Sequence, residues 1–233
     1  MIANWLASEE TIEALKILQT EFPLAIWETF YVTVVATLFS FIIGLPVGVL
    51  LATGSKDGIL PLPKWLMGLL DVVINLLRSV PFLILMIMVF PLTRLLIGTT
   101  VGTVASIVPL VIAAFPFVAR LAESSFREVN PDIIEAAQSM GATPFQIIIK
   151  VLIPESIPSL ISNATIAITT ILGYSAMSGI IGGGGLGKIA INYGYYRYKT
   201  LVMIFAVILL IVLVQIFQSI GTYLAKKSDK RLV

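Results

Sequence analysis

The sequence predicts an all-α membrane protein with several transmembrane helices, because its composition is apolar and its apolar stretches are long. Of the 233 residues, 58% are hydrophobic and only 12% are charged, and the mean hydropathy is +1.02. So few charged residues cannot cover the surface of a soluble globule of this length. Five apolar stretches approach or exceed the roughly 20 residues that a helix needs to cross about 30 Å of hydrocarbon. None alternates strictly between polar and apolar residues, so helices are predicted rather than the strands of a barrel.

We expect one transmembrane domain over residues 26–224, followed by a basic tail over 225–233. Charged or turn-forming residues separate its five helices, and the more polar segment 120–156 lies between the third and the fourth. The expected transmembrane helices are 26–53, 66–90, 101–119, 157–181 and 201–224.

Residues 1–25 precede the first transmembrane helix and are predicted to form an external amphipathic helix on the membrane surface. The acidic residues of this segment are Glu9, Glu10, Glu13 and Glu21. The apolar stripe expected opposite them is formed by Trp5, Leu6, Ile12, Leu15, Leu18 and Phe22. The segment has no basic leader followed by an apolar stretch, so no secretory signal peptide is expected. The alternative is an end of the chain without a function.

Small and polar residues distinguish the first two transmembrane helices. Gly44 and Gly48 have the spacing that suits close helix packing. Asp71, Asn75 and Arg78 share one face of the second helix. Ionisable groups at this depth face a protein interior or a water-filled cavity. The spacing favours an ion pair between Asp71 and Arg78, and the alternative places Arg78 on a polar path through the membrane.

Two short helices are predicted between the third and fourth transmembrane helices. Asn130 is a suitable N-cap with Pro131 at the first helical position, and Gly141 is a suitable C-terminal stop. Thr143 begins the second helix, with Pro144 in its first position and Gln146 completing a capping box. We expect that helix to run to about Leu152 and to be broken by Pro154.

The first short helix has the features of a docking surface for a soluble partner. Its apolar residues Ile133, Ile134, Ala137 and Met140 can share one face. The small side chains of Ala136 and Ala137 let another surface approach the backbone, and Glu135 offers a charge to a basic residue of a partner. The alternative is a helical hairpin that only connects two transmembrane helices.

The run Gly182–Lys188 resembles a phosphate-binding loop, but we reject that interpretation. Ile189 stands where Ser or Thr would bind Mg²⁺, and a membrane helix rather than a strand precedes the run. The glycines therefore predict a tight turn after the fourth transmembrane helix.

The charges of the connecting segments predict that the N-terminus is outside and the C-terminus is cytoplasmic. This arrangement leaves outside only Lys16, Arg94, Lys188, Arg197 and Lys199. It places a larger number of basic residues in the cytoplasm, namely Lys56, Lys64, Arg120, Arg127, Lys150, Lys226, Lys227, Lys230 and Arg231. The segment 120–156 then faces the compartment that contains ATP.

The residue types exclude several classes of chemistry. The chain has no Cys and no His, so disulfides, thiolate or imidazole metal sites and a His-based triad are excluded. The basic residues are scattered, and we expect no nucleic-acid partner. We expect no cofactor and no catalytic residue. The cytoplasmic cluster Glu123, Glu128, Asp132 and Glu135 is interpreted as a solvated face.

Glu135-Ala136-Ala137, Gly141 and the Ile153-Pro154 ending resemble the coupling motif of ABC importer permeases. Val151 and Ile153 depart from it, since that family usually has Ile and Leu there. The likeness runs from about Trp27 to the end of the fifth transmembrane helix. It is closest to the methionine-type permeases in the runs Arg78–Phe82, Pro116–Arg120, Gly141–Pro144, Gly173–Met177 and Tyr193–Tyr195.

The resemblance implies a subunit of a type I importer in the plasma (inner) membrane of a bacterium. Two copies of the chain would form the path for an amino acid, with methionine as the expected substrate. Two cytoplasmic ATPase subunits would use ATP and Mg²⁺, and an external binding protein would deliver the substrate, with the glycine-rich turn as one place it could touch. The residues implied in ATPase coupling are Glu135, Ala136, Ala137, Gly141 and Pro154. The candidates for the gate or the path are Met177, Arg78, Tyr174 and Ser175.

A self-sufficient secondary transporter or channel is the alternative function. Five transmembrane helices do not divide into two equal inverted halves, and no acidic residue lies deep in the first, third, fourth or fifth helix to carry a coupling ion. These observations favour a subunit that depends on a separate ATPase.

Overall fold

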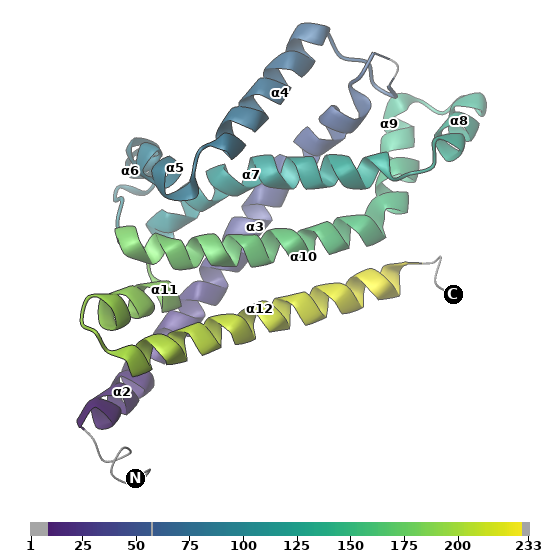
Figure 1. Ribbon diagram of the computed structural model, residues 1–233. Coiled ribbons are helices and arrows are strands. Elements are labelled where there is room, and N and C mark those ends of the chain that lie inside the picture. Colours follow the sequence, from purple (N-terminus) through teal and green to yellow (C-terminus); the bar gives the residue numbers. More distant parts are fainter. Residues whose placement is uncertain (1–8, 57, 230–233) are drawn as a thin grey trace. The chain divides into compact units, whose positions relative to one another are not determined.

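The computed structural model describes residues 9–56 and 58–229, and every regular element within these ranges is helical (Figure 1). Within them, four helical stretches are long and apolar enough to cross a membrane. They are α3 (Phe22–Thr53), α7 (Thr103–Arg127), the run Pro144–Ile181, and α12 (Thr200–Ser228). The prediction of an all-α membrane fold is confirmed.

The second predicted transmembrane helix is a broken one, so the prediction of a continuous helix over 66–90 was wrong. It consists of two separate helices, α4 (Lys64–Ser79) and α5 (Phe82–Met88), and α6 (Phe90–Ile97) follows. Val80 ends α4 in an extended conformation, with φ −79° and ψ 127°. A residue before proline is driven out of the helical region by the proline ring, so Pro81 explains the break.

The helix that contains the third predicted transmembrane segment, α7, continues beyond residue 119 as far as Arg127. The charges in this extension satisfy one another. Arg120 forms an ion pair with Glu123 at 2.7 Å, and Arg127 pairs with the same carboxylate at 2.9 Å. Helix neighbours three and four residues apart can pair in this way without interrupting the helix.

Pro154 does not end a helix, which corrects the expected break before the fourth transmembrane helix. The run consists of α9 (Pro144–Ile147), the π-helix η1 (Ile148–Leu152), α10 (Ile153–Ser178) and the short 3₁₀ turn η2 (Gly179–Ile181). Pro154 occupies the second position of α10, directly after the π-helix. There the Ile153 N–H bonds the carbonyl of Ile148, five residues back. The wider turn of a π-helix relieves the clash between a proline ring and the preceding turn.

The described residues fall into two compact units. The first contains those up to Ala36, together with Phe82–Leu110 and Thr169–Ile216. The second contains Thr37–Pro81, Val111–Ile168 and the residues from Phe217 onward.

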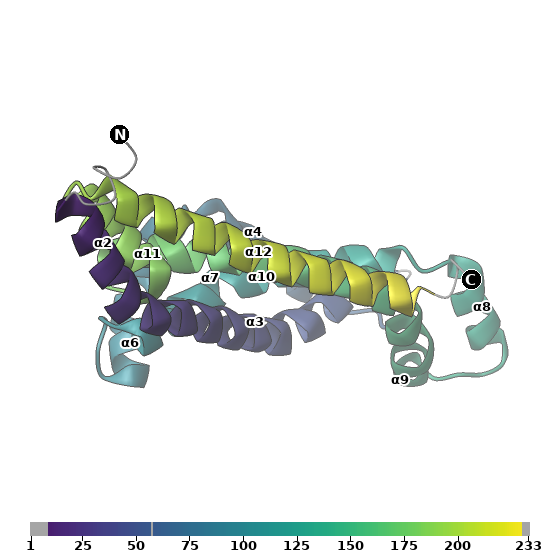
Figure 2. The ribbon, with the colours of Figure 1, turned by 90° about the horizontal axis from the view of Figure 1, so that it is seen from below.

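In the first unit, α2 (Glu9–Thr20) packs beside α11 (Gly185–Ile189) and the beginning of α12, as Figures 1 and 2 show. Ala14 and Ile17 are buried there against Leu186 and Val202. Ile12 and Leu15 of the predicted apolar stripe are exposed, and the position of this helix on the membrane surface stays a prediction. Small Ala14 allows a close approach of helices that the larger side chains would prevent. Residues 1–8, with Trp5 and Leu6, lie outside the described residues, as do Lys230 and Arg231 of the predicted basic tail.

In the second unit, α3 and α7 pack closely at two glycines, as their spacing predicted. A Cβ atom at Gly44 would lie 2.8 Å from the Val118 side chain, and one at Gly48 would lie 2.7 Å from that of Ala122. Neighbouring apolar residues complete this core, including Leu51, Ile74, Ala119, Phe126 and Leu152. The helix backbones approach each other because both positions lack a side chain.

Candidate functional site

The first of the two predicted short helices forms as predicted, whereas the second, α9, is only the first turn of the run that continues through Pro154; Figure 2 shows α8 and α9 beside each other. In α8 (Pro131–Ser139), the Asn130 side chain accepts a hydrogen bond of 2.9 Å from the Asp132 N–H. The helix ends at Gly141, whose φ of +81° lies in the left-handed region that glycine favours. Both ends of α8 are therefore determined by local sequence.

The capping box predicted for the next helix is also present. The N–H of Thr143 donates to the Gln146 side chain at 2.9 Å, and the N–H of Gln146 donates to the Thr143 hydroxyl at 3.4 Å. The Ala142 N–H reaches back to the carbonyl of Ala137 at 3.1 Å. These bonds link α8 to α9 through a short turn of defined geometry.

The side chains of α8 and α9 divide into those buried against the rest of the chain and those exposed on the outside. Ala137 is only 5% exposed, while Glu135, Ala136 and Met140 are exposed, and so is Phe145 at the start of α9. Met140 is therefore open on the outside of α8, whereas Ala137 is covered by its own chain. Ala137 packs inside its own chain, which leaves the other four to form the outward surface.

A cavity of about 500 Å³ lies behind α8. Glu135 and Arg127 both contribute to its wall. The remaining lining residues come from the end of α3, the loop after it, α7, α8 and η1, and include Thr53, Ile59, Phe126, Ile134 and Leu152. The side of α8 that faces this cavity is therefore not tightly filled.

The candidate gate residues at the end of α10 have different environments. Met177 is 46% exposed. Tyr174 is half-buried and stacks on Phe82, with ring centroids 4.6 Å apart and an interplanar angle of 4°. Ser175 is buried and its hydroxyl donates to the Leu172 carbonyl at 2.8 Å. Of the three, only Met177 presents its side chain on an open face of this chain.

Met177 belongs to a short open stripe that runs from the end of α10 into η2. Gly173 and Ile180 are exposed at positions four before and three after it, so the three share one helix face. A Cβ atom added at Gly173 would meet nothing within 4 Å. This stripe is apolar and available for contact with another chain.

Arg78 does not pair with Asp71, so the favoured prediction for the second transmembrane helix was wrong. Asp71 instead accepts from Arg120 of α7 at 2.7 Å, and Arg120 also donates to Asn75 at 3.2 Å. Arg78 is exposed, and none of the residues that the structure describes forms an ion pair with it. The partner of Asp71 lies 49 residues away in the chain, beyond the range of a helix-spacing argument.

The glycine-rich run is a buried packing element, and the tight turn predicted there is confirmed. Gly182 and Gly185 have φ values of +93° and +80°. The Gly185 N–H donates to the Glu28 carboxylate at 2.7 Å, and the next N–H, of Leu186, donates to the Thr29 hydroxyl at 2.8 Å. These N–H groups are occupied by the chain itself, which supports the rejection of a phosphate-binding loop.

Glu28 is a residue that the sequence reasoning missed. Its carboxylate also accepts from the Thr103 hydroxyl at 2.7 Å, so it connects α3, the start of α7 and the start of α11. A Cβ atom at Gly184 would lie 2.1 Å from that hydroxyl, which shows how closely the segments approach. The sequence offered a signal for this contact. Glu28 is an acidic residue at the start of the predicted transmembrane helix 26–53, and the glycine run could supply backbone N–H groups to it.

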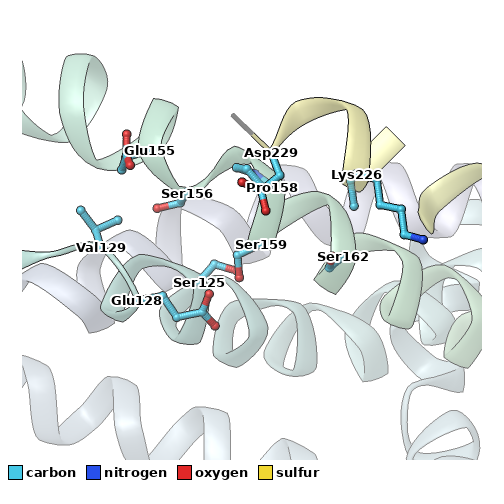
Figure 3. Close-up of a pocket in the computed structure, with 11 residues that line it drawn as sticks. Ser125, Glu128, Val129, Glu155, Ser156, Pro158, Ser159, Ser162, Lys226 and Asp229 are labelled. Atoms are coloured by element: carbon cyan, nitrogen blue, oxygen red, sulfur yellow. The ribbon is translucent and has the colours of Figure 1, made fainter. Parts of the chain in front are cut away.

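A polar cavity of about 320 Å³ lies between α7, α10 and the end of α12 (Figure 3). Ser125 and Ser159 meet across it at 3.2 Å, and Asn163 donates to Ser125 at 2.8 Å. Its charged lining residues are Glu128, Glu155, Lys226 and Asp229. Within the described parts of the chain, no group of three or more acidic residues is arranged to hold a metal ion.

Comparison with known proteins identifies the kind of molecule to which these features belong. The family model of the binding-protein-dependent transport system inner membrane component matches residues 44–230. The chain belongs to this family. It is a membrane component of a transport system, and the relatives below carry permease names.

Two relatives indicate the branch of the family. The chain is 52% identical over 208 residues to the probable D-methionine transport system permease protein MetI of Vibrio cholerae, a match that covers 89% of this chain and 92% of the relative. It is 46% identical over 154 residues to the D-methionine transport system permease protein MetI of Escherichia coli K12, covering 66% and 70% of the two chains.

Solved structures agree with the family and its fold. A chain of the inward-facing MetNI methionine ABC transporter matches this permease with a TM-score of 0.88 and 41% identity, over 96% of this chain and all of the other. An amino acid ABC transporter crystallised with histidines matches with a TM-score of 0.72 at 18% identity, over 93% and 96% of the two chains. The second likeness is one of fold alone.

Proposed function

We propose that this permease imports methionine as the membrane subunit of an ATP-driven transporter. The observation that carries the proposal is the 52% identity to a probable D-methionine permease over 89% of the chain. The match to the MetNI methionine transporter supports the same substrate and the same assembly. In this assembly two copies of the chain form the path, separate cytoplasmic subunits hydrolyse ATP, and an external binding protein delivers the substrate.

The outward surface of α8 and α9, formed by Glu135, Ala136, Met140 and Phe145, is the proposed contact with the ATPase. Two large apolar side chains project from it at 82% and 70% exposure, with a carboxylate beside them. Such exposed apolar groups are costly in water and stabilise a complex when a partner covers them. Ala137 and Gly141 have a supporting role, since the first anchors α8 and the second sets the turn.

Motion at the ATPase reaches the membrane through the helical run that begins at α9. This run is unbroken from Pro144 to Ile181, and it contains Pro154 and the π-helix near its start. A displacement of α9 therefore has a continuous helical route into α10. The cavity behind α8 supplies the room for that displacement, and two alternating states of the pair correspond to two states of the path.

Met177 is the proposed gate residue, and it closes the path by meeting its copy in the second subunit. The exposed stripe of Gly173, Met177 and Ile180 supports this role, because an apolar, flexible side chain between small or aliphatic neighbours can seal against an identical surface. Tyr174, through its stack on Phe82, and Ser175, through its buried hydrogen bond, position the helix that carries the gate. Arg78 remains a candidate for the path, because it is a charge without an ion-pair partner among the described residues.

The proposed topology has the N-terminus outside and the C-terminus in the cytoplasm, as the distribution of basic residues indicates. It places α8 and α9 on the side of the ATPase. It also places outside the exposed tyrosines Tyr195, Tyr196 and Tyr198, which surround Arg197. We assign the contact with the binding protein to this aromatic loop rather than to the buried glycine run.

The test is co-purification of the ATPase subunits with the tagged permease, followed by methionine uptake in a strain that lacks its own permease. Ala136→Arg places a large charge on the outward surface, and we expect it to lose the ATPase and the uptake together. Gln19→Arg is the control, because Gln19 is exposed on α2 and lies outside the predicted transmembrane domain. Ala137→Arg is a less suitable variant, since the buried position would disturb the chain's own packing.

If wild-type permease brings down no ATPase, or if Ala136→Arg retains it, the coupling surface is wrong. Uptake that persists without any ATPase would instead support a self-sufficient transporter.

A further inference from the structure

A basic cavity lies where the loop between α3 and α4 meets α7, all within the second unit. Its volume is about 430 Å³. The charged side chains that line it are Lys56, Lys64, Asp71, Arg120, Glu123 and Arg127. Four of these groups are cationic and two are anionic, so the lining carries a net positive charge.

The two carboxylates are already bound by the two arginines. Arg120 pairs with both Asp71 and Glu123, and Arg127 pairs with Glu123. Neither Lys56 nor Lys64 has an ion-pair partner within residues 9–56 and 58–229. Asp57, next to Lys56 in the chain, lies outside the described residues. The positive charge of the cavity therefore resides on the two lysines that stand at the ends of the loop.

The position of Lys64 at the start of α4 makes the electrostatic potential of the cavity more positive. It is the first residue of α4, at the positive end of the helix dipole, and the first turn of that helix contains no acidic residue. No side chain caps the N-terminus of α4. A cation in this position is weakly unfavourable, and an anion bound beside it would offset that cost.

An apolar strip leads away from the same cavity along α4. Trp65, Leu69, Val72 and Leu76 recur every three or four residues and are all more than half exposed. Trp beside Lys is the combination found where a membrane helix meets the head-group layer. The strip has the chemistry of a surface for hydrocarbon chains, and it begins where the basic cavity ends.

We propose that this cavity binds the phosphate of an anionic phospholipid whose acyl chains lie along the exposed face of α4. Lys56 and Lys64 bind the phosphate, while the ion pairs of Arg120 hold the cavity wall in place. Basic pockets beside membrane helices bind anionic head groups in this way. On the proposed topology the lipid belongs to the cytoplasmic leaflet.

The test is lipid binding by the purified full-length permease, with any subunits that co-purify, followed by native mass spectrometry after delipidation. Phosphatidylglycerol and phosphatidylcholine with identical chains are added in separate titrations. The variant is Lys56→Gln/Lys64→Gln, and the matched control is Lys150→Gln/Lys227→Gln, which removes the same charge from exposed positions outside the cavity. A parallel titration includes an excess of inorganic phosphate.

We expect wild-type permease and the control to bind phosphatidylglycerol in preference to phosphatidylcholine, and the cavity variant to lose roughly tenfold in that preference. Inorganic phosphate should not displace the lipid, since it lacks the acyl chains. Equal losses in the variant and the control would overturn the site. Displacement by phosphate would show a site for free phosphate, and dissociation of a permease dimer in the cavity variant would show that a second copy covers this face. Because the readout is binding, these outcomes are separate from those of the uptake test.

Discussion

Glu28 shows how one side chain can hold several segments of a membrane protein together. Its carboxylate accepts hydrogen bonds from Thr103 and from the backbone of Gly185, while the neighbouring Thr29 accepts from Leu186. The backbone N–H groups at the start of a helix must find acceptors when water is excluded. The carboxylate supplies one, and the glycines allow it to approach.

Replacement of Glu28 by Ala should lower the stability of the permease by about 2 kcal/mol, because two hydrogen bonds to a charged group are lost. Thermal unfolding in detergent measures the effect as a fall in Tm. Glu21→Ala is the control, since Glu21 is exposed and lies in the turn between α2 and α3. Equal Tm values for the two variants would contradict the role assigned to Glu28.

Packing between α3 and α7 depends on the same principle, because the glycines of α3 lack the side chains that would keep α7 away. At Gly48, a Cβ atom would lie 2.8 Å from the Ala119 carbonyl as well as close to Ala122. At Gly68 in α4, by contrast, nothing lies within 4 Å of the Cβ position. Two glycines in apolar helices therefore have opposite tolerance for substitution.

Gly48→Val should destabilise the contact between α3 and α7 by about 1–3 kcal/mol, the range for overpacking of a filled core. Gly68→Val is the matched control and should change Tm little. The measurement is thermal unfolding of both purified variants, with yield in the membrane fraction as a second readout. A stable Gly48→Val protein would show that the helices separate at low cost.

The capping box of α9 leads to a prediction for α8 and α9, the proposed contact with the ATPase. Thr143→Ala removes the acceptor for the Gln146 N–H and should weaken this helix start by about 1 kcal/mol. We expect reduced co-purification of the ATPase and slower uptake, with the Tm of the membrane domain nearly unchanged. Thr143→Ser retains the hydroxyl and should restore both, whereas a defect shared by Ser and Ala would point to the lost methyl group instead.

At the scale of the whole molecule, the proposed transport cycle links an outward coupling surface, an unbroken helical run and a gate. The run from Pro144 to Ile181 begins at the capped turn and reaches beyond Met177. Each part can be disturbed separately, so a defect at the gate should differ in kind from a defect at the coupling pair.

Met177→Ala should uncouple ATP hydrolysis from uptake, because a smaller side chain leaves the proposed seal open. We expect ATPase activity in reconstituted vesicles to persist while methionine accumulation falls severalfold. Met88→Ala is the control, since Met88 is also an exposed methionine in a membrane segment. Normal accumulation by the Met177 variant would remove it from the gate.

The sequence by itself determined the membrane class, four helices long and apolar enough to cross a membrane, and the caps at Asn130, Gly141 and Thr143. These features depend on apolar length and on residues within one helical turn of each other. The break before Pro81 also had a local signal, the Val80-Pro81 pair. The prediction of a continuous helix followed the length of the apolar stretch instead of this signal.

Only the tertiary structure decided that Asp71 pairs with Arg120, that Ala137 faces inward while Met140 projects, and that Glu28 receives the N–H of Gly185. The physical reason is that each depends on a contact or an orientation set by another element. Periodicity shows which residues share a face of a helix, but packing selects the face that is covered and the distant charge that becomes its partner.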